Sequence, residues 1–265
     1  MISNLEKPPN ARHVTRSGQT ALLNRLELKY FVDRTTRTAL RRDLLTFMRP
    51  DVHAGAEGSY LVRSLYFDTP DYLAYHEKLS GMAARNKLRI RTYGDASDPD
   101  TVVRLEVKAR YLSFIKKLTM DLSQQEYGAV ELALRRRTLA SASLVDHKSP
   151  IKEFFRLQRQ YNMEPKILIQ YRRQALERRE LYRVRVNFDD ELLATRNLDL
   201  LSPLRGTRRL LRYGNAIFEI KVDGAMPQWL HMLICKYNLQ NQAISKYCHA
   251  VRSEARFSAS GRADD

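Results

Sequence analysis

Lys87-Leu-Arg89-Ile-Arg91 places a basic side chain at every second position, with an aliphatic residue in each gap. Successive side chains of a β-strand point to opposite faces, so the cations share one face and the aliphatic residues the other. One such strand is ordinarily the solvated face of a sheet. Five of them, with few Ser or Thr among the charges, predict a sheet that closes on itself around a charged lumen. The other four stretches mix carboxylates with cations: Arg25-Leu-Glu27-Leu-Lys29, Arg104-Leu-Glu106-Val-Lys108, Arg183-Val-Arg185-Val-Asn187-Phe-Asp189 and Glu219-Ile-Lys221-Val-Asp223.

The whole pattern predicts an α+β fold, an antiparallel β-barrel tunnel with a charged lumen and flanking helices. About eight strands are expected, the number that encloses a small lumen. Helices are expected near 33–48, 70–79, 123–137, 150–161 and 227–239, the second capped by Thr69 and the third opened by the capping box Ser123-Gln-Gln-Glu126. We expect one domain over 21–252, a flexible N-terminus over 1–20 and a disordered tail over 253–265. The strands are expected near 22–32, 60–67, 85–93, 102–109, 112–122, 167–174, 182–189 and 216–222.

The charge balance predicts an anionic partner. The 265 residues carry a formal net charge of +16, which fits nucleic acid, a membrane surface or a phosphate-rich substrate. Cys235 and Cys248 have no metal-ligand spacing and fit a reducing cytosol. Met1 to Asn10 shows no secretory signal, and the apolar cluster from Trp229 to Cys235 is too short to span a bilayer. A cytoplasmic protein is therefore expected.

Eight short blocks of mixed charged and apolar residues follow one another along the chain. They are Leu26-Glu-Leu-Lys-Tyr30, Ser64-Leu-Tyr-Phe-Asp-Thr69, Lys87-Leu-Arg-Ile-Arg91, Leu105-Glu-Val-Lys108, Tyr171-Arg-Arg173, Arg185-Val-Asn-Phe-Asp189, Phe218-Glu-Ile-Lys221 and Ser245-Lys-Tyr247. In this order they resemble the VTC domain, the catalytic domain of vacuolar transporter chaperone polyphosphate polymerases. That domain belongs to the triphosphate tunnel metalloenzymes, together with the CYTH-type triphosphatases. The resemblance covers about residues 22–250, and it is the order of the blocks that makes it specific.

The resemblance implies roles for individual residues. Glu219 would bind a divalent metal, typically Mn²⁺ or otherwise Mg²⁺, while Glu27 and Glu106 would either assist it or pair with Lys and Arg. One of Lys116 and Lys117 would occupy a further basic position, and the sequence leaves open which. The catalytic set would be Lys246, Arg89, Arg91 and Arg185, and the phosphate-binding set Lys29, Lys108, Arg173, Lys221 and Ser245.

The activity that the resemblance implies is an ATP-dependent polyphosphate polymerase with ATP and inorganic polyphosphate as partners. The alternatives are a metal-dependent triphosphatase or polyphosphatase and a non-catalytic polyphosphate-binding subunit. Arg25, at a position where the wider superfamily has Glu, argues against a CYTH-type triphosphatase. The sequence shows neither an SPX sensor nor transmembrane segments, so we expect a separately encoded membrane-protein partner and a place at the inner face of a membrane. Cations interleaved with carboxylates argue against specific nucleic-acid binding.

Overall fold

The computed structural model describes residues 25–54, 58–96, 98–111, 114–136, 138, 150–179 and 183–260. Eight strands form one antiparallel path in the order β1-β10-β8-β7-β3-β4-β5-β6, and the two-residue strands β2 and β9 pair with β7 and β8. The predicted antiparallel sheet with flanking helices is confirmed. The strands are β1 (Arg25–Val32), β2 (Arg49–Pro50), β3 (Tyr60–Asp68), β4 (Ala84–Tyr93), β5 (Val103–Tyr111), β6 (Phe114–Leu122), β7 (Glu164–Arg179), β8 (Arg183–Thr195), β9 (Arg208–Arg209) and β10 (Ala216–Asp223).

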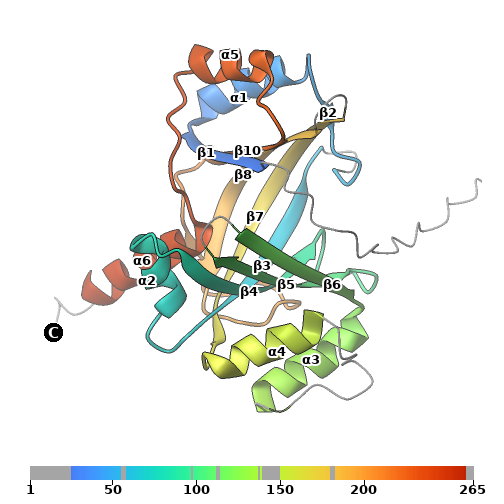
Figure 1. Ribbon diagram of the computed structural model, residues 1–265, viewed down its shortest axis with the longest axis vertical. Helices are drawn as coiled ribbons and strands as arrows, with labels where there is room; N and C mark the ends of the chain where they lie inside the picture. Colours follow the sequence, from blue (N-terminus) through green and yellow to red (C-terminus); the bar gives the residue numbers. More distant parts are fainter. Residues whose placement is uncertain are drawn as a thin grey trace, which may run out of the picture.

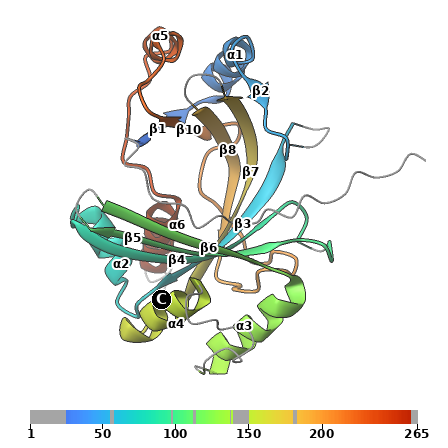
Figure 2. The ribbon, with the colours of Figure 1, turned by 45° about the vertical axis from the view of Figure 1, so that its right-hand side comes forward.

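The sheet curls strongly along this path. β1, β10, β8 and β7 form the upper part of the molecule, and β4, β5 and β6 cross beneath them (Figures 1 and 2). Within the described residues, β1 and β6 end the path without pairing with each other, so a seam remains and the sheet is a half-barrel. Full closure was therefore wrong. Both edges carry cations, Lys29 on β1 and Lys117 on β6, and like charges facing each other disfavour strand pairing.

Two pairs of helices cover the outer face of the sheet. α1 (Arg34–Leu44) and α5 (Gln228–Lys236) pack on the upper strands, while α3 (Gln124–Arg136) and α4 (Pro150–Gln160) pack on the lower ones. The aliphatic residues of the alternating stretches supply the contacts, as Ile90 does below and Ile220 above. Burying each such side chain contributes about 1.5–3 kcal/mol. The apolar half of the alternation thus holds the helices and leaves the charged half on the inner face.

Local hydrogen bonds set the helix ends. The capping box is confirmed, because Ser123 N donates to Glu126 Oε2 at 2.7 Å and Glu126 N donates to Ser123 Oγ at 3.2 Å. The helix expected from Pro70 begins later, as α2 (Leu73–Leu79). Tyr72 before it is left-handed, with φ 60°, and Thr69 Oγ1 accepts from Leu73 N at 2.8 Å. Thr69 therefore caps the helix from four residues away.

The sequence analysis did not anticipate α6 (Lys246–Ser260). Residues 253–260, where the sequence analysis expected a disordered tail, are drawn as the continuation of this helix. Neither Gly nor Pro interrupts the sequence from Lys246 to Ser260, and nothing else in it stops a helix. Residues 1–20 and 261–265, expected to be flexible or disordered, lie outside the described residues.

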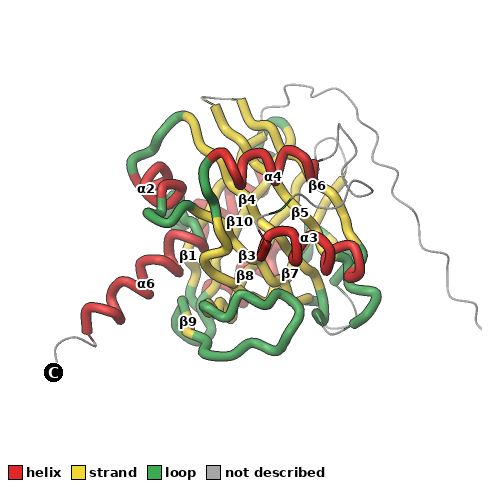
Figure 3. Tube along the Cα trace, turned by 90° about the horizontal axis from the view of Figure 1, so that it is seen from below, coloured by secondary structure: helices red, strands yellow, loops and turns green. Residues whose placement is uncertain are grey.

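α6 packs on the inner side of the sheet. Its Tyr247, Cys248 and Ala250 lie in one buried cluster with Tyr171 of β7 and Ile217 of β10. Arg173 lies two residues after Tyr171 on β7, and Glu219 lies two residues after Ile217 on β10. Because side chains alternate along a strand, both therefore point to the same inner face. Seen from below, α6 approaches the sheet beside β1 and β9 (Figure 3). The helix therefore fills one end of the inner face and brings its first residue, Lys246, to the charged side chains.

Candidate active site on the charged inner face

Glu219 is the centre of one group of charges. It is 5% exposed, and its carboxylate lies 3.5 Å from Lys29 Nζ, 3.3 Å from Lys221 Nζ and 3.8 Å from Arg173 Nη2. Burial alone raises the pKa of Glu219, but Lys221, Lys29 and Lys246 outweigh burial and hold the pKa well below its usual range. The surrounding cations therefore favour the ionised form of Glu219.

Asp189 joins β7, β8 and α6. It is fully buried, and its Oδ1 accepts from Arg173 Nε at 2.6 Å and its Oδ2 from Arg173 Nη2 at 2.8 Å. Lys246 Nζ lies 2.5 Å from the same Oδ2. Burial raises the pKa of Asp189, but Arg173 and Lys246 together lower it to about 2. Lys246 Nζ also lies 4.7 Å from the centre of the Tyr171 ring. Asp189 therefore fixes the positions of two cations for which the sequence implied phosphate contacts.

A second group of charges lies on the lower strands. Glu106 accepts from Arg89 Nε at 2.7 Å, and its carboxylate lies 3.8 Å from Arg91 Nε and 3.3 Å from Lys117 Nζ. Burial opposes ionisation of Glu106, yet Arg89, Arg91 and Lys117 lower its pKa to about 2. Lys117, rather than Lys116, therefore joins the inner face, which resolves the alternative that the sequence left open.

Tyr66 of β3 connects the two groups. Arg89 Nη1 lies 3.4 Å from its hydroxyl, and its ring stacks on Tyr247 of α6 with a centroid distance of 5.5 Å. Burial raises the pKa of Tyr66, but Arg89, Arg91 and Lys246 bring it down to about 8. That effect requires cations from β4 and from α6 to act on one phenol. Tyr66 thus contacts Arg89 of the lower group and Tyr247, the chain neighbour of Lys246, and links the two charged groups.

Other basic residues surround these groups. Arg185 Nη2 donates to Asp51 Oδ2 at 2.5 Å and to the Tyr60 hydroxyl at 3.2 Å. These bonds tie Arg185 of β8 to the residue after β2 and to the start of β3. Desolvation lowers the pKa of Lys87 to about 8 and also lowers that of Lys108, which Glu27 on the far edge partly offsets. Burial is therefore the main cause of both pKa shifts, and the neighbouring Lys29 adds to it.

The named inner-face residues carry more positive than negative charge. Ten cationic side chains stand against five carboxylates, an excess of five positive charges. A buried surface with this excess stabilises a bound polyanion, because each added phosphate replaces repulsion with attraction. The cations are Lys29, Lys87, Arg89, Arg91, Lys108, Lys117, Arg173, Arg185, Lys221 and Lys246, and the carboxylates are Glu27, Asp51, Glu106, Asp189 and Glu219.

The structure brings together nearly all the residues that the sequence singled out. Ser245 differs, because its hydroxyl accepts from the backbone nitrogen of Cys248 at 3.3 Å and so serves the first turn of α6. The side chain of Arg25 lies outside what the structure describes. The sequence analysis missed Asp189, although Asp189 follows Arg185 and Asn187 in the same alternation. It also missed Asp51, which follows β2 and carries no signal of its own.

A divalent cation fits this site only as a metal shared with the substrate. Among the described residues, no three Asp, Glu, His or Cys side chains gather as a metal cluster. Glu106 and Glu219 each lie within 3.8 Å of three cations, but Glu219 also lies beside Asn187, whose buried Oδ1 has no hydrogen-bond partner. Mg²⁺ and similar ions commonly use one or two protein oxygens and complete their shell with phosphates and water. The donor set at Glu219 fits that mode.

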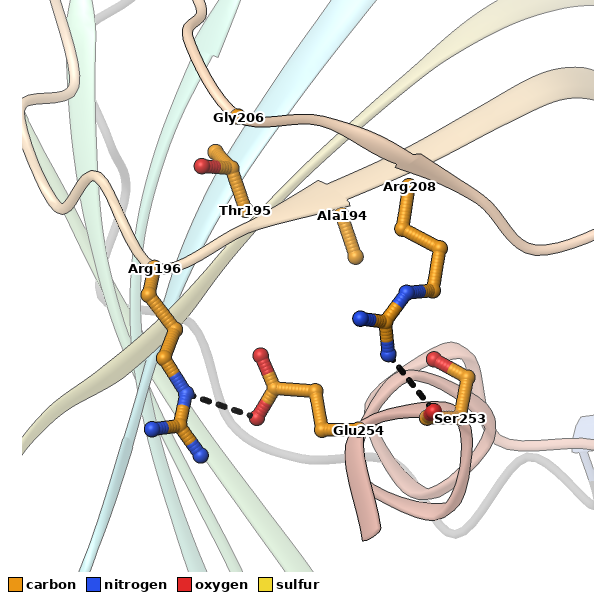
Figure 4. A pocket seen from close by; sticks show the side chains of 7 residues that line it. All are labelled: Ala194, Thr195, Arg196, Gly206, Arg208, Ser253 and Glu254. Carbon is orange, nitrogen blue, oxygen red and sulfur yellow. Dashed lines mark hydrogen bonds and ion pairs between the residues drawn. The ribbon is translucent and has the colours of Figure 1, made fainter. Parts of the chain in front are cut away.

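A separate pocket lies outside the inner face, between the end of β8, β9 and α6 (Figure 4). Its volume is about 280 Å³. Arg196 pairs with Glu254 at 3.2 Å and Arg208 donates to the Ser253 carbonyl at 2.6 Å, so both arginines already contact α6. These contacts hold the C-terminal half of the helix whose first residue is Lys246.

Residues 24–255 match the family described as VTC domain. The chain belongs to the VTC domain family. A curated relative of this VTC-domain protein, vacuolar transporter chaperone complex subunit 4 of Trypanosoma cruzi (strain CL Brener), is 26% identical over 226 residues. That match covers 72% of this chain and 28% of the relative, so the chain spans little more than a quarter of the relative's length. The family match confirms the resemblance.

Two solved structures are similar to this VTC-domain protein over most of its length. A putative adenylyl cyclase from Hippeastrum, described as having a dominant triphosphatase activity, is 16% identical with a TM-score of 0.47, over 86% of this chain and 95% of that one. A putative adenylate cyclase from Bacillus halodurans is 16% identical with a TM-score of 0.45, over 83% of this chain and 92% of that one. Separately, none of the helices in the described part is long and apolar enough to cross a membrane.

Proposed function

We propose that this VTC-domain protein is an ATP-dependent polyphosphate polymerase that transfers the γ-phosphoryl group of ATP to the end of a polyphosphate chain on its inner face. The observation that carries the proposal is the meeting of Lys246, Arg173, Arg89 and Arg91 around Tyr66 and Tyr171, on a surface with an excess of five positive charges. That surface suits a ligand with about one negative charge per phosphoryl unit.

Phosphoryl transfer needs accurate placement and charge neutralisation more than covalent help from the protein. A terminal oxygen of the polyphosphate chain attacks the γ-phosphorus, the bond from that phosphorus to the bridging oxygen breaks, and ADP leaves with the bridging oxygen. Lys246, held by Asp189, neutralises oxygens of the transferring group. Arg89 and Arg91 are two residues apart on one strand, about 6.6 Å, and so contact successive phosphates. Inorganic phosphate or pyrophosphate serves as the first acceptor.

Glu219 would hold the divalent cation, Mn²⁺ or Mg²⁺. When bound, the cation would neutralise phosphate oxygens and fix their orientation. We assign Glu106 to charge balance instead, because Arg89 contacts its Oε2 at 2.7 Å through Nε and at 2.5 Å through Nη2. Lys29, Lys221 and Arg173 lie farther from Glu219, at 3.3 to 3.8 Å. Glu27 pairs with Lys29 at 2.7 Å, and we assign it to charge balance as well.

The test is incubation of the pure protein with ATP and Mn²⁺, with products resolved by phosphorus NMR and gel electrophoresis. We expect ADP and long-chain phosphate, both lost in Lys246→Ala and Glu219→Ala. Arg196→Ala is the matched control, because that exposed arginine pairs with Glu254 away from the inner face. Orthophosphate and ADP without chains would make the protein a triphosphatase. Tight polyphosphate binding without turnover would make it a binding subunit, and either result would overturn the polymerase.

A membrane-protein partner and a location at a membrane belong to the same proposal. The curated relative is named as a subunit of a complex. We infer that this protein works at the cytoplasmic face of a membrane, bound to a separately encoded membrane protein that receives the polymer. Affinity purification of the tagged protein from its native cells, after gentle detergent extraction, is expected to recover one membrane protein in fixed ratio. Recovery of the protein alone from the soluble fraction would contradict this extension.

A further inference from the structure

Asn187 of β8 carries an unused oxygen beside Glu219. The two residues face each other across the β8–β10 ladder, and Asn187 Nδ2 donates to Glu219 Oε2 at 3.4 Å. Asn187 is fully buried, and its Oδ1 has no hydrogen-bond partner. An unpaired buried acceptor is unfavourable, and folded proteins rarely retain such groups without a compensating role.

The geometry of the amide suits a metal ion. A half-turn about the terminal torsion of Asn187 exchanges its oxygen and nitrogen, which are nearly equal in size and position. The oxygen would then lie where the nitrogen now lies, 3.4 Å from Glu219 Oε2. Adjacent oxygens around Mg²⁺, with bonds of about 2.1 Å, are about 3 Å apart. Small side-chain movements therefore place both oxygens on one octahedral cation.

The other carboxylates nearby are engaged. Asp189 is held by Arg173 and Lys246, and Glu106 by its three cations. A neutral amide oxygen adds a ligand without adding charge. A site with one carboxylate and one amide holds a cation weakly by itself and needs phosphate oxygens to complete the shell. Metal binding would thus depend on the presence of the substrate.

We propose that Asn187 is a second protein ligand of the divalent cation, binding through Oδ1 beside Glu219, with phosphate oxygens and water in the remaining positions. This rests on the metal site of the proposed function and adds a residue to it. In the metal-free protein the amide donates to Glu219, and in the loaded protein it turns its oxygen to the ion. The ligand class is a hard divalent cation bound together with a di- or triphosphate.

The test measures the affinity for tripolyphosphate by calorimetry, with and without Mn²⁺, in the full chain. The ratio of the two affinities is the metal enhancement. Asn187→Leu is expected to reduce this enhancement at least about tenfold, the loss typical even of residues that only support metal ligands. Because the enhancement is a ratio, any change in the metal-free affinity is divided out, and a thermal melting curve of each variant serves as the control for folding. No enhancement in the wild-type protein, or equal enhancement in Asn187→Leu, would overturn the proposal.

Asn187→Asp separates a ligand from a mere hydrogen-bond donor. If Asn187 only donates to Glu219, a second carboxylate repels the first, and the enhancement falls as it does in the Leu variant. If Asn187 is a ligand, Asp supplies a stronger oxygen, and the enhancement equals or exceeds that of the wild type. This variant decides alone if Asn187→Leu does not fold. If Mn²⁺ strengthens tripolyphosphate binding through Asn187 but the protein makes no polyphosphate from ATP, the polymerase proposal is refuted and the ligand assignment stands.

Discussion

Asp189→Asn should destabilise the protein strongly while barely changing its shape. Asp189 is fully buried and compensates Arg173 and Lys246, whose side chains are 8% and 12% exposed. Removing its charge leaves two buried cations facing the other cations of the inner face. Breaking a buried ion pair from one side costs about 3–5 kcal/mol. A domain is stable by only about 5–15 kcal/mol, so the variant would lose a large share of its stability.

Urea unfolding with and without tripolyphosphate measures this effect. The bound anion supplies the negative charge that the variant lacks, so it should stabilise Asp189→Asn more than the wild type. Asp121→Asn is the matched control, since Asp121 pairs with Arg104 at 2.6 Å but both side chains are well exposed, 51% and 37%. Its expected cost is below about 1 kcal/mol. A loss in Asp189→Asn no larger than in Asp121→Asn would refute the charge-compensation reasoning.

Three further predictions concern pH, the sixth strand and the last helix. The pKa of Lys87 is about 8, and a bound anion favours its charged form, so affinity for tripolyphosphate should be full below pH 8 and fall as pH rises through about 8. Lys87→Arg should reduce this fall in a calorimetric pH series, and an unchanged slope would contradict the assignment. Lys117→Ala should weaken tripolyphosphate binding more than Lys116→Ala, and equal losses would refute the placement of Lys117 beside Glu106. Ser245→Ala removes the oxygen at the start of α6 and should cost about 1 kcal/mol, or about 2–4 °C in Tm, with little change in tripolyphosphate affinity. A large loss of affinity at constant Tm would instead give Ser245 a direct phosphate contact.

The period-two alternation determined what could be predicted about the sheet. In Lys87-Leu-Arg89-Ile-Arg91 it assigned each residue to a face, and the structure shows Ile90 buried outside and Arg91 paired with Glu106 inside. Closure could not be predicted in the same way. Whether β1 and β6 meet depends on how far the sheet coils, which is a property of all eight strands rather than of any one.

In the candidate site, too, local features could be predicted from the sequence and long-range contacts could not. Residues on regular strands were placed correctly because alternation fixes their direction. α6 was missed, and with it the reason why Lys246 reaches the inner face, because its apolar contacts with Tyr171 and Ile217 are distant in sequence. The ion pair between Asp51 and Arg185 is also long-range and has no local pattern. Sequence periodicity therefore gives the faces of elements, and tertiary packing decides which faces meet.

The most direct test of the central claim is a crystal structure of the protein with tripolyphosphate and Mn²⁺. The account predicts phosphate density along the inner face, contacted by Arg89, Arg91 and Lys246, with the anomalous signal of Mn²⁺ beside Glu219. Phosphate bound elsewhere, for example at the pocket beside Arg196 and Arg208, with the inner face free of it, would contradict the account.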